Sequence, residues 1–176
     1  MTCVVGIIDK KGVGHMAADT LGTFDGEGVT NDYLEPKVFR KDGLLIGYCG
    51  SYRLGQLLKY YLEVPKREKD KSFDDWLNFD FVSGVKMLLK AYGNETEIYP
   101  FLVIAKGRLF RVNTDYSVLE PADLFDAIGS GAAAAKGAYS VIDNNKTPKQ
   151  LLTLLVKAAA RYTYSVGGRV DYLKEK

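Results

Sequence analysis

The chain has few residues suited to metal binding or to a disulfide framework. Its 176 residues include only two cysteines, Cys3 and Cys49, and one histidine, His15. The two cysteines form neither a CxxC pair nor a zinc-ligand spacing, which argues against a structural zinc site and against a disulfide scaffold. We therefore expect no metal, no cofactor and a reducing, cytoplasmic compartment.

Neither sign of charge dominates the chain, and long apolar runs are missing. The 24 basic and 22 acidic residues leave a formal net charge of +2, too small to predict binding of nucleic acid or an anionic membrane. The basic residues within 66–71 are interleaved with acidic ones, as in a solvated loop. No apolar run could span a bilayer, and we expect no secretory signal at the N-terminus.

The composition is that of an ordinary globular protein. Hydrophobic residues make up 47% of the chain and charged residues 26%, which argues against disorder and against a membrane protein. A chain of this length is expected to form one core, and no internal repeat or linker interrupts it. We interpret residues 1–176 as a single domain.

Three pairs of apolar stretches, each pair separated by a short turn, predict β-hairpins. The pairs are 2–8 with 13–19, 37–40 with 44–49, and 99–105 with 108–112. In the second pair the turn contains Asp42-Gly43, a strong hairpin signal. Single short strands are expected at 124–129 and 170–173. The polar, Gly-rich segment 20–36 is expected to be a surface loop with room for short strands.

Four segments are predicted to be helices, three from apolar residues at helical spacing and 132–142 from the helix propensity of its alanine run. They are 54–62, 72–89, 132–142 and 147–164. Ser72 begins the second segment with a capping-box pattern, and Thr147-Pro148 begins the fourth. Hairpins and helix pairs therefore alternate along the chain. This order predicts an α+β fold, a four-layer αββα sandwich of two antiparallel sheets between helix pairs.

Thr2 directly follows Met1, and an aminopeptidase is expected to remove a methionine that precedes such a small residue. Once exposed, Thr2 could use its own α-amine as the base that activates its hydroxyl, so no histidine is required. An unperturbed α-amine has a pKa of about 7.7 to 8.0, which leaves a useful neutral fraction. A nearby lysine would lower this pKa, and Lys37 is the candidate.

Several short motifs occur in one order along the chain and together resemble a known family. They are Thr2-Cys3-Val4-Val5-Gly6-Ile7, Gly12 followed by Ala17-Ala18-Asp19, Lys37-Val38, Leu45-Ile46-Gly47-Tyr48-Cys49-Gly50, and Ile128-Gly129-Ser130-Gly131. The chain resembles the proteasome β-subunit and HslV peptidases over most of its length. These proteins are N-terminal-nucleophile hydrolases.

The resemblance implies a threonine-type peptidase that acts on peptide or protein substrates within a homo-oligomeric ring. A separate ATPase would unfold its substrates, because the chain itself has no Walker-type phosphate loop. Thr2 would be the nucleophile. Asp19 would orient Lys37 and the Thr2 amine, while Lys37 would lower the pKa of the nucleophilic centre. The backbone N–H of Gly47 would serve as the oxyanion hole.

Two serines complete the site that the resemblance implies. Ser130 would hydrogen-bond near the Thr2 amine and assist proton transfer, and Ser165 would belong to the same network. In the proteasome the segment before this second serine carries an aspartate, whereas here Tyr162 stands in its place. The hydrogen-bond network around Ser165 must therefore differ from that of the family.

The spacing before Asp19 also departs from the family. Asp19 follows Thr2 by 17 positions (19 − 2), one more than the resemblance implies. A β-bulge near Gly14-His15 would absorb the extra residue. Alternatively Cys3 is the nucleophile, which would require removal of Thr2 as well.

These departures leave two further functions open. One is a non-catalytic ring or particle component that keeps the fold, including a phage-encoded or virion-associated protein. The other is an amidohydrolase that acts on a small amide through Cys3. Taken singly, Asp19 could also be a residue that caps a turn, and Lys37 an exposed charge at a strand edge.

Overall fold

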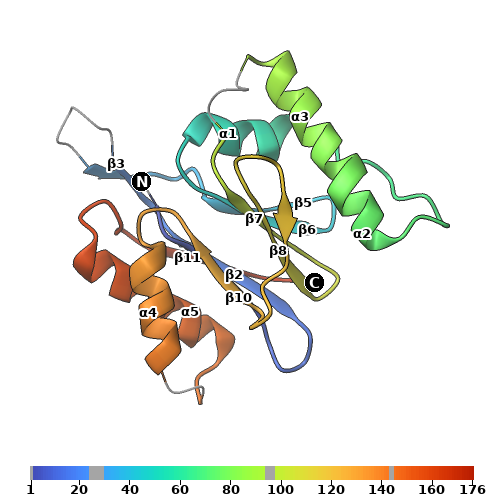
Figure 1. The fold of residues 1–176 in the computed structure, drawn as a ribbon. Helices are drawn as coiled ribbons and strands as arrows, with labels where there is room; N and C mark the ends of the chain where they lie inside the picture. The colour runs from blue at the N-terminus through green and yellow to red at the C-terminus, as the bar shows by residue number, and fades with distance from the viewer. Residues whose placement is uncertain (1, 24–29, 94–97, 143–144) are drawn as a thin grey trace.

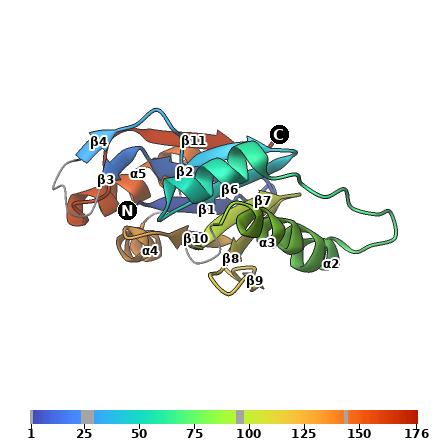
Figure 2. The ribbon, with the colours of Figure 1, turned by 90° about the horizontal axis from the view of Figure 1, so that it is seen from above.

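The computed structural model describes residues 2–23, 30–93, 98–142 and 145–176. At its centre are two antiparallel sheets, of four strands in the order β10-β1-β2-β11 and of five strands in the order β5-β6-β7-β8-β9. Figure 1 shows α4 and α5 on one side of these sheets and α1 to α3 on the other, and Figure 2 gives the view from above. The predicted four-layer αββα sandwich is confirmed.

The N-terminal hairpin forms the middle of the first sheet. β1 (Val4–Ile8) pairs with β2 (Gly14–Asp19), and β10 (Phe125–Ile128) and β11 (Val170–Lys174) flank this pair. Every residue of β1 and β2 is buried. β1 is covered on both faces, which explains why its sequence is continuously apolar instead of alternating. The two polar side chains of β2, His15 and Asp19, are buried with hydrogen-bond partners.

The predicted bulge near Gly14-His15 is wrong, because β1 and β2 keep one register along all five residues of β1. The extra residue lies instead in the turn 9–13, where the Asp9 carboxylate accepts two backbone N–H groups. Beyond the ladder, the Asp19 N–H donates to the Cys3 carbonyl at 3.3 Å. Asp19 therefore lies opposite the residue that follows Thr2, and the longer turn does not displace it.

The second sheet contains the other two predicted hairpins. Its strands are β5 (Val38–Lys41), β6 (Leu44–Tyr48), β7 (Phe101–Ala105), β8 (Arg108–Val112) and β9 (Val118–Leu119). Asp42 and Gly43 both have positive φ, at 47° and 85°, as the predicted Asp-Gly turn requires. The two-residue strand β9 was not predicted.

A separate two-stranded ribbon lies within the segment predicted to be a surface loop. It consists of β3 (Leu21–Thr23) and β4 (Thr30–Asp32), which pair antiparallel. The part of the predicted loop between them, 24–29, lies outside the described residues. β3 follows Asp19 almost directly and therefore stays close to the first sheet.

The helices form two outer layers. One layer contains α1 (Tyr52–Gln56) continued by the π-helical turn η1 (Leu57–Tyr61), and α2 (Phe73–Asp75), the π-helical turn η2 (Trp76–Phe81) and α3 (Val82–Ala91). The other contains α4 (Ala132–Val141) and α5 (Pro148–Tyr162). Helix α5 begins at Thr147-Pro148 as predicted, and Thr147 and Gln150 form a reciprocal capping box there. Within the described residues, no helix is long and apolar enough to cross a membrane.

Three apolar cores separate the four layers. Between the two sheets pack Val4, Met16, Leu45, Leu102, Ile104 and Ile128. A second core joins α1 to α3 to the five-stranded sheet, and a third joins α4 and α5 to the four-stranded sheet. Neighbouring residues such as Val4 and Val5 contribute to different cores, because side chains alternate along a strand.

Candidate active site

The loop between β10 and α4 fixes the backbone of Thr2. The Thr2 N–H donates to Ser130 Oγ at 3.2 Å, and the Thr2 carbonyl accepts the Gly131 N–H at 3.2 Å. Gly129 in the same loop has a φ of +89°, and a Cβ there would lie 2.2 Å from the Thr2 carbonyl oxygen. Only glycine permits this approach, so the Gly-Ser-Gly motif positions the backbone of Thr2.

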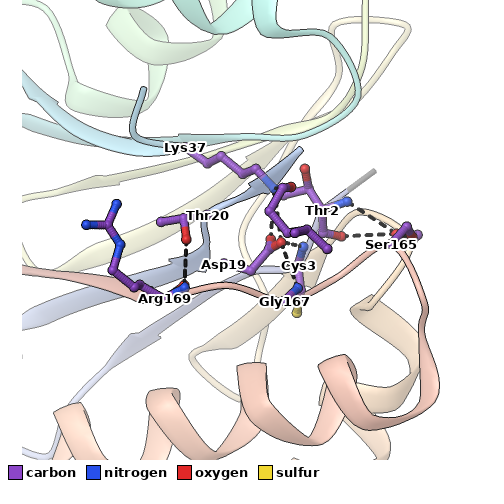
Figure 3. Close-up of polar contacts among 10 residues, drawn as sticks. Thr2, Cys3, Asp19, Thr20, Lys37, Ser165, Gly167 and Arg169 are labelled. Carbon is purple, nitrogen blue, oxygen red and sulfur yellow. Dashed lines mark hydrogen bonds and ion pairs between the residues drawn. The ribbon is translucent and has the colours of Figure 1, made fainter. Parts of the chain in front are cut away.

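The carboxylate of Asp19, the last residue of β2, joins three segments of the chain (Figure 3). Its Oδ1 accepts the Cys3 N–H at 2.8 Å, and both of its oxygens accept hydrogen bonds from Lys37 Nζ at 3.1 Å. Its Oδ2 also accepts the Gly167 N–H at 3.2 Å. Asp19 is only 1% exposed, and these contacts satisfy a charge that burial would otherwise make costly. Asp19 therefore does more than cap a turn.

Lys37 is buried rather than exposed at a strand edge, with 2% of its surface accessible. Besides Asp19, its Nζ hydrogen-bonds the Leu21 carbonyl at 2.6 Å. Burial lowers the pKa of Lys37, and the Asp19 carboxylate partly opposes that shift. Figure 3 shows the side chain reaching from the second sheet toward Asp19 and Thr2. A buried lysine with a perturbed pKa beside a hydroxyl residue is typical of a catalytic centre.

The two predicted serines lie together. Ser130 Oγ is 3.1 Å from Ser165 Oγ, and Ser165 is fully buried in the loop between α5 and β11. Tyr162, which stands where the family has an aspartate, is 80% exposed. Most of its side chain therefore faces solvent, and it does not replace the missing carboxylate at the serine pair.

Gly47 lies inside the second sheet, in register with Val38 of β5 and Leu102 of β7. A Cβ at this position would come within 2.6 Å of both Val4 Cγ1 and Met16 Sδ in the facing sheet. Close packing of the two sheets is thus sufficient reason for a glycine here. The predicted oxyanion role of its N–H stays a prediction.

The structure gives Cys3 an environment that disfavours nucleophilic attack. Its side chain is fully buried in the core beneath α5, where desolvation, followed by the nearby Asp19 charge, raises the thiol pKa to about 12. The thiolate is the reactive form of cysteine, and it is not accessible there at neutral pH. His15 is no better as a base for Thr2, because its ring contacts Tyr172 at 2.6 Å and Asp9 at 3.0 Å.

A cavity of about 530 Å³ opens beside Thr2. Its walls include Ser130, Cys49, Tyr99 and Arg111. Two other cavities, of about 640 and 720 Å³, are larger, but neither touches Thr2. The sequence pattern did not indicate Tyr99 or Arg111, because no local motif marks them and only contacts between distant parts of the chain bring them to the site. Nowhere in the described ranges do three or more His, Cys, Asp or Glu side chains gather as a metal site.

Solved structures resemble this chain along almost its whole length. Thiobacillus denitrificans BPH superposes with a TM-score of 0.79 at 23% identity, covering 97% of this chain and 96% of that one. The chain has a proteasome-like N-terminal-nucleophile fold. HslV from Trypanosoma brucei gives a TM-score of 0.71 at 18% identity over 98% of both chains. The ancestral β-subunit Anbu from Yersinia bercovieri gives 0.72 at 15%, covering 98% of this chain and 81% of that one.

No protein-family model and no curated protein matches the sequence. At these identities the structural likeness concerns the HslV-like fold, and the chemistry has to be argued from the site. Hydrogen bonds link the Asp19 and Lys37 side chains to each other and Ser130 to both Thr2 and Ser165. Cys3 connects the Asp19–Lys37 pair with the Thr2–Ser130–Ser165 group, because it follows Thr2 in the chain and its N–H donates to Asp19.

Proposed function

We propose that the chain is a threonine-type peptidase subunit, which cleaves peptide bonds with Thr2 after Met1 has been removed. The observation that carries this proposal is the buried Asp19–Lys37 pair beside a residue that aminopeptidase trimming would make N-terminal. A structural ion pair would more simply be replaced by apolar residues, since a buried pair contributes little net stability. A lysine charge next to an α-amine, by contrast, lowers the pKa of that amine and favours its neutral, basic form.

Removal of Met1 would turn the Thr2 amide nitrogen into a free α-amine, which already lies 3.2 Å from Ser130 Oγ. This amine accepts the proton of the Thr2 hydroxyl, and the hydroxyl oxygen attacks the substrate carbonyl carbon. The positive charge of Lys37 lowers the amine pKa and so enlarges its neutral fraction near pH 7. Asp19 holds the lysine in place.

Attack would give a tetrahedral intermediate, for whose oxyanion the family resemblance names the Gly47 N–H as the donor. The protonated amine then gives its proton to the departing amine, the peptide C–N bond breaks, and an ester links the acyl group to Thr2. Water, deprotonated by the same α-amine, hydrolyses the ester. Ser130, which contacts both Thr2 and Ser165, supplies a hydroxyl relay for these proton transfers.

The proposal includes assembly into a homo-oligomer, with peptide or protein substrates and a separate unfolding ATPase. Large apolar side chains are exposed on the layer formed by α1 to α3, which would suit contacts between subunits. They are Tyr60, Tyr61, Phe79, Met87 and Tyr92. A relative, Anbu from Pseudomonas aeruginosa, is described as a helical assembly.

One observation favours a second candidate, a non-catalytic component that keeps the fold. The aspartate of the family is replaced by Tyr162, whose side chain is 80% exposed. The serine pair consequently lacks a carboxylate partner from this position. A particle protein, phage-encoded or cellular, would tolerate such a loss, whereas an enzyme would depend on the remaining Ser130–Ser165 contact.

Hydrolysis of fluorogenic peptides by matched variants separates these candidates. Thr2→Ser keeps a hydroxyl and should retain measurable turnover, whereas Thr2→Ala should lose it. Both substitutions keep a small residue after Met1, so trimming should proceed, and N-terminal sequencing checks this. Activity of Thr2→Ala equal to that of the unmodified chain would contradict the proposal. Trimmed chains that all fail to hydrolyse any peptide would favour the non-catalytic component.

A further inference from the structure

Arg111 alone carries a charged side chain among the residues described as lining the cavity beside Thr2. It belongs to β8, and its side chain is 30% exposed. The cavity walls are otherwise small, apolar or neutral, with Cys49 and Tyr99 among them. A single cation in such surroundings strongly influences which side chain can occupy the cavity.

The strand register explains how Arg111 reaches the cavity. Gly47, Leu102 and Arg111 are direct cross-strand partners in β6, β7 and β8, so they share one face of the sheet. Leu102 packs in the core between the two sheets, which identifies this face as the inner one. Arg111 therefore points toward the first sheet, in the same row as Gly47.

Neighbouring groups hold Arg111 without neutralising it. Its Nε donates to Asn113 Oδ1 at 2.8 Å, and Nη1 lies 3.6 Å from Asp126 Oδ2. Asp126 is contacted more closely by Lys136, whose Nζ lies 2.6 Å from Oδ1. Two cations therefore share one carboxylate, leaving a net charge of +1. Within the described part of the chain, Nη2 has no hydrogen-bond partner, although a guanidinium can donate five hydrogen bonds.

The electrostatic surroundings of the Cys49 thiol agree with this placement. Burial raises the pKa of Cys49 to about 11, and the positive charges of Arg111 and Lys37 oppose the shift. The cavity wall at Cys49 therefore lies within electrostatic reach of both the site lysine and Arg111.

We propose that Arg111 makes this cavity a subsite for an acidic side chain, so that the chain cleaves peptides after Asp or Glu. The inference rests on the peptidase function proposed above. Thr2 itself lines the cavity, so the substrate side chain that enters the cavity is the one nearest the carbonyl that Thr2 attacks. A substrate carboxylate there can accept a hydrogen bond from Nη2 of Arg111, while the methylene groups of the same substrate side chain contact Cys49 and Tyr99.

The test compares kcat/KM for two fluorogenic peptides that differ only in Glu or Gln before the cleaved bond. The unmodified chain should prefer Glu by about tenfold or more, the size expected for a charge-assisted hydrogen bond. Arg111→Met should bring the ratio near one, mainly by slowing cleavage after Glu. Arg108→Met removes the same charge from the same strand outside the cavity, so it should leave the ratio unchanged.

Asp126→Asn provides a test of the opposite sign. Removing this carboxylate takes away the anion that competes for Arg111, so the Glu preference should increase. If Arg111 were only a structural brace, Arg111→Met would slow both peptides equally and lower the melting temperature, which would overturn the inference. Equal cleavage of both peptides by the unmodified chain would also overturn it while leaving the peptidase function intact. Failure of the trimmed chain to cleave either peptide would contradict both.

Discussion

At the residue scale, the site depends on a carboxylate and an ammonium group that are both almost inaccessible to water. Asp19 and Lys37 lie 3.1 Å apart, and each is about 2% exposed or less. Each charge offsets the hydration that the other loses on burial, and either charge alone in the interior would carry a large desolvation penalty. The sequence supplied both residues as candidates, but only the structure shows that they meet.

Asp19→Asn should therefore destabilise the protein by about 3–5 kcal/mol, since Lys37 would remain buried without its counter-ion. Adding Lys37→Met should recover part of this loss, because the double variant buries no charge at the pair. Urea unfolding of the single and double variants measures the coupling. Strictly additive losses would show that the two side chains do not act as a pair.

The buried Cys3 thiol predicts a pH dependence of stability. Its pKa of about 12 in the folded chain lies above the ordinary value of 9.0, so below pH 9 both states keep the proton. Between pH 9 and 12 the unfolded state loses the proton first, and stability falls as the pH rises, by at most about 1.4 kcal/mol per pH unit.

Urea unfolding of the unmodified chain and of Cys3→Ala from pH 7 to 10.5 should show a flatter decline in the variant. Comparing the two chains cancels the contributions of other groups, including the lowered pKa of Lys37. Parallel curves would mean that the Cys3 thiol is not shielded, and would revive it as a candidate nucleophile.

At the element scale, hairpins and helices could be predicted because their signals are local. The Asp42-Gly43 turn and the helix start at Thr147-Pro148 both have the predicted structure. The β9 strand was missed because two residues are too few to show the alternation of apolar and polar residues that marks a strand. The bulge near Gly14-His15 was predicted wrongly, since a sequence does not reveal whether an inserted residue enters a strand or lengthens its turn.

Gly47→Ala tests how closely the elements fit at the site. The added Cβ would approach Val4 and Met16 to 2.6 Å, and such overpacking costs about 1–3 kcal/mol. Thermal unfolding should show the loss, and a companion Val4→Ala should relieve part of it. Activity that returns together with stability would indicate a packing role only, while persistent loss would support the oxyanion role of the Gly47 N–H.

At the scale of the whole molecule, the order of hairpins and helix pairs was enough to predict the four layers. The cavity beside Thr2 could not be predicted in the same way. Arg111 reaches it through the register of the second sheet, and Tyr99 reaches it from the segment just before β7, so both depend on contacts far apart in the sequence. Local sequence patterns thus predict the fold, whereas the residues on the substrate-facing side of the site are brought together by contacts between distant parts of the chain.

The exposed apolar side chains of the α1 to α3 layer predict self-association. Light scattering coupled to size exclusion should give a mass several times that of one 19.5 kDa chain. Phe79→Glu together with Met87→Glu should weaken the assembly, because both side chains are more than 60% exposed and charges oppose apolar burial. A monomer at tens of micromolar would contradict the homo-oligomer.

The central claim is that Thr2 becomes an N-terminal nucleophile. Intact-mass analysis of the purified protein, before and after treatment with epoxomicin, tests it most directly, and BPH from Thiobacillus denitrificans has been solved in complex with this compound. We predict a chain that lacks Met1 and gains the mass of one inhibitor, an adduct that Thr2→Ala does not form. A chain that retains Met1 and gains no adduct would contradict the account, and loss of both leading residues would point to Cys3.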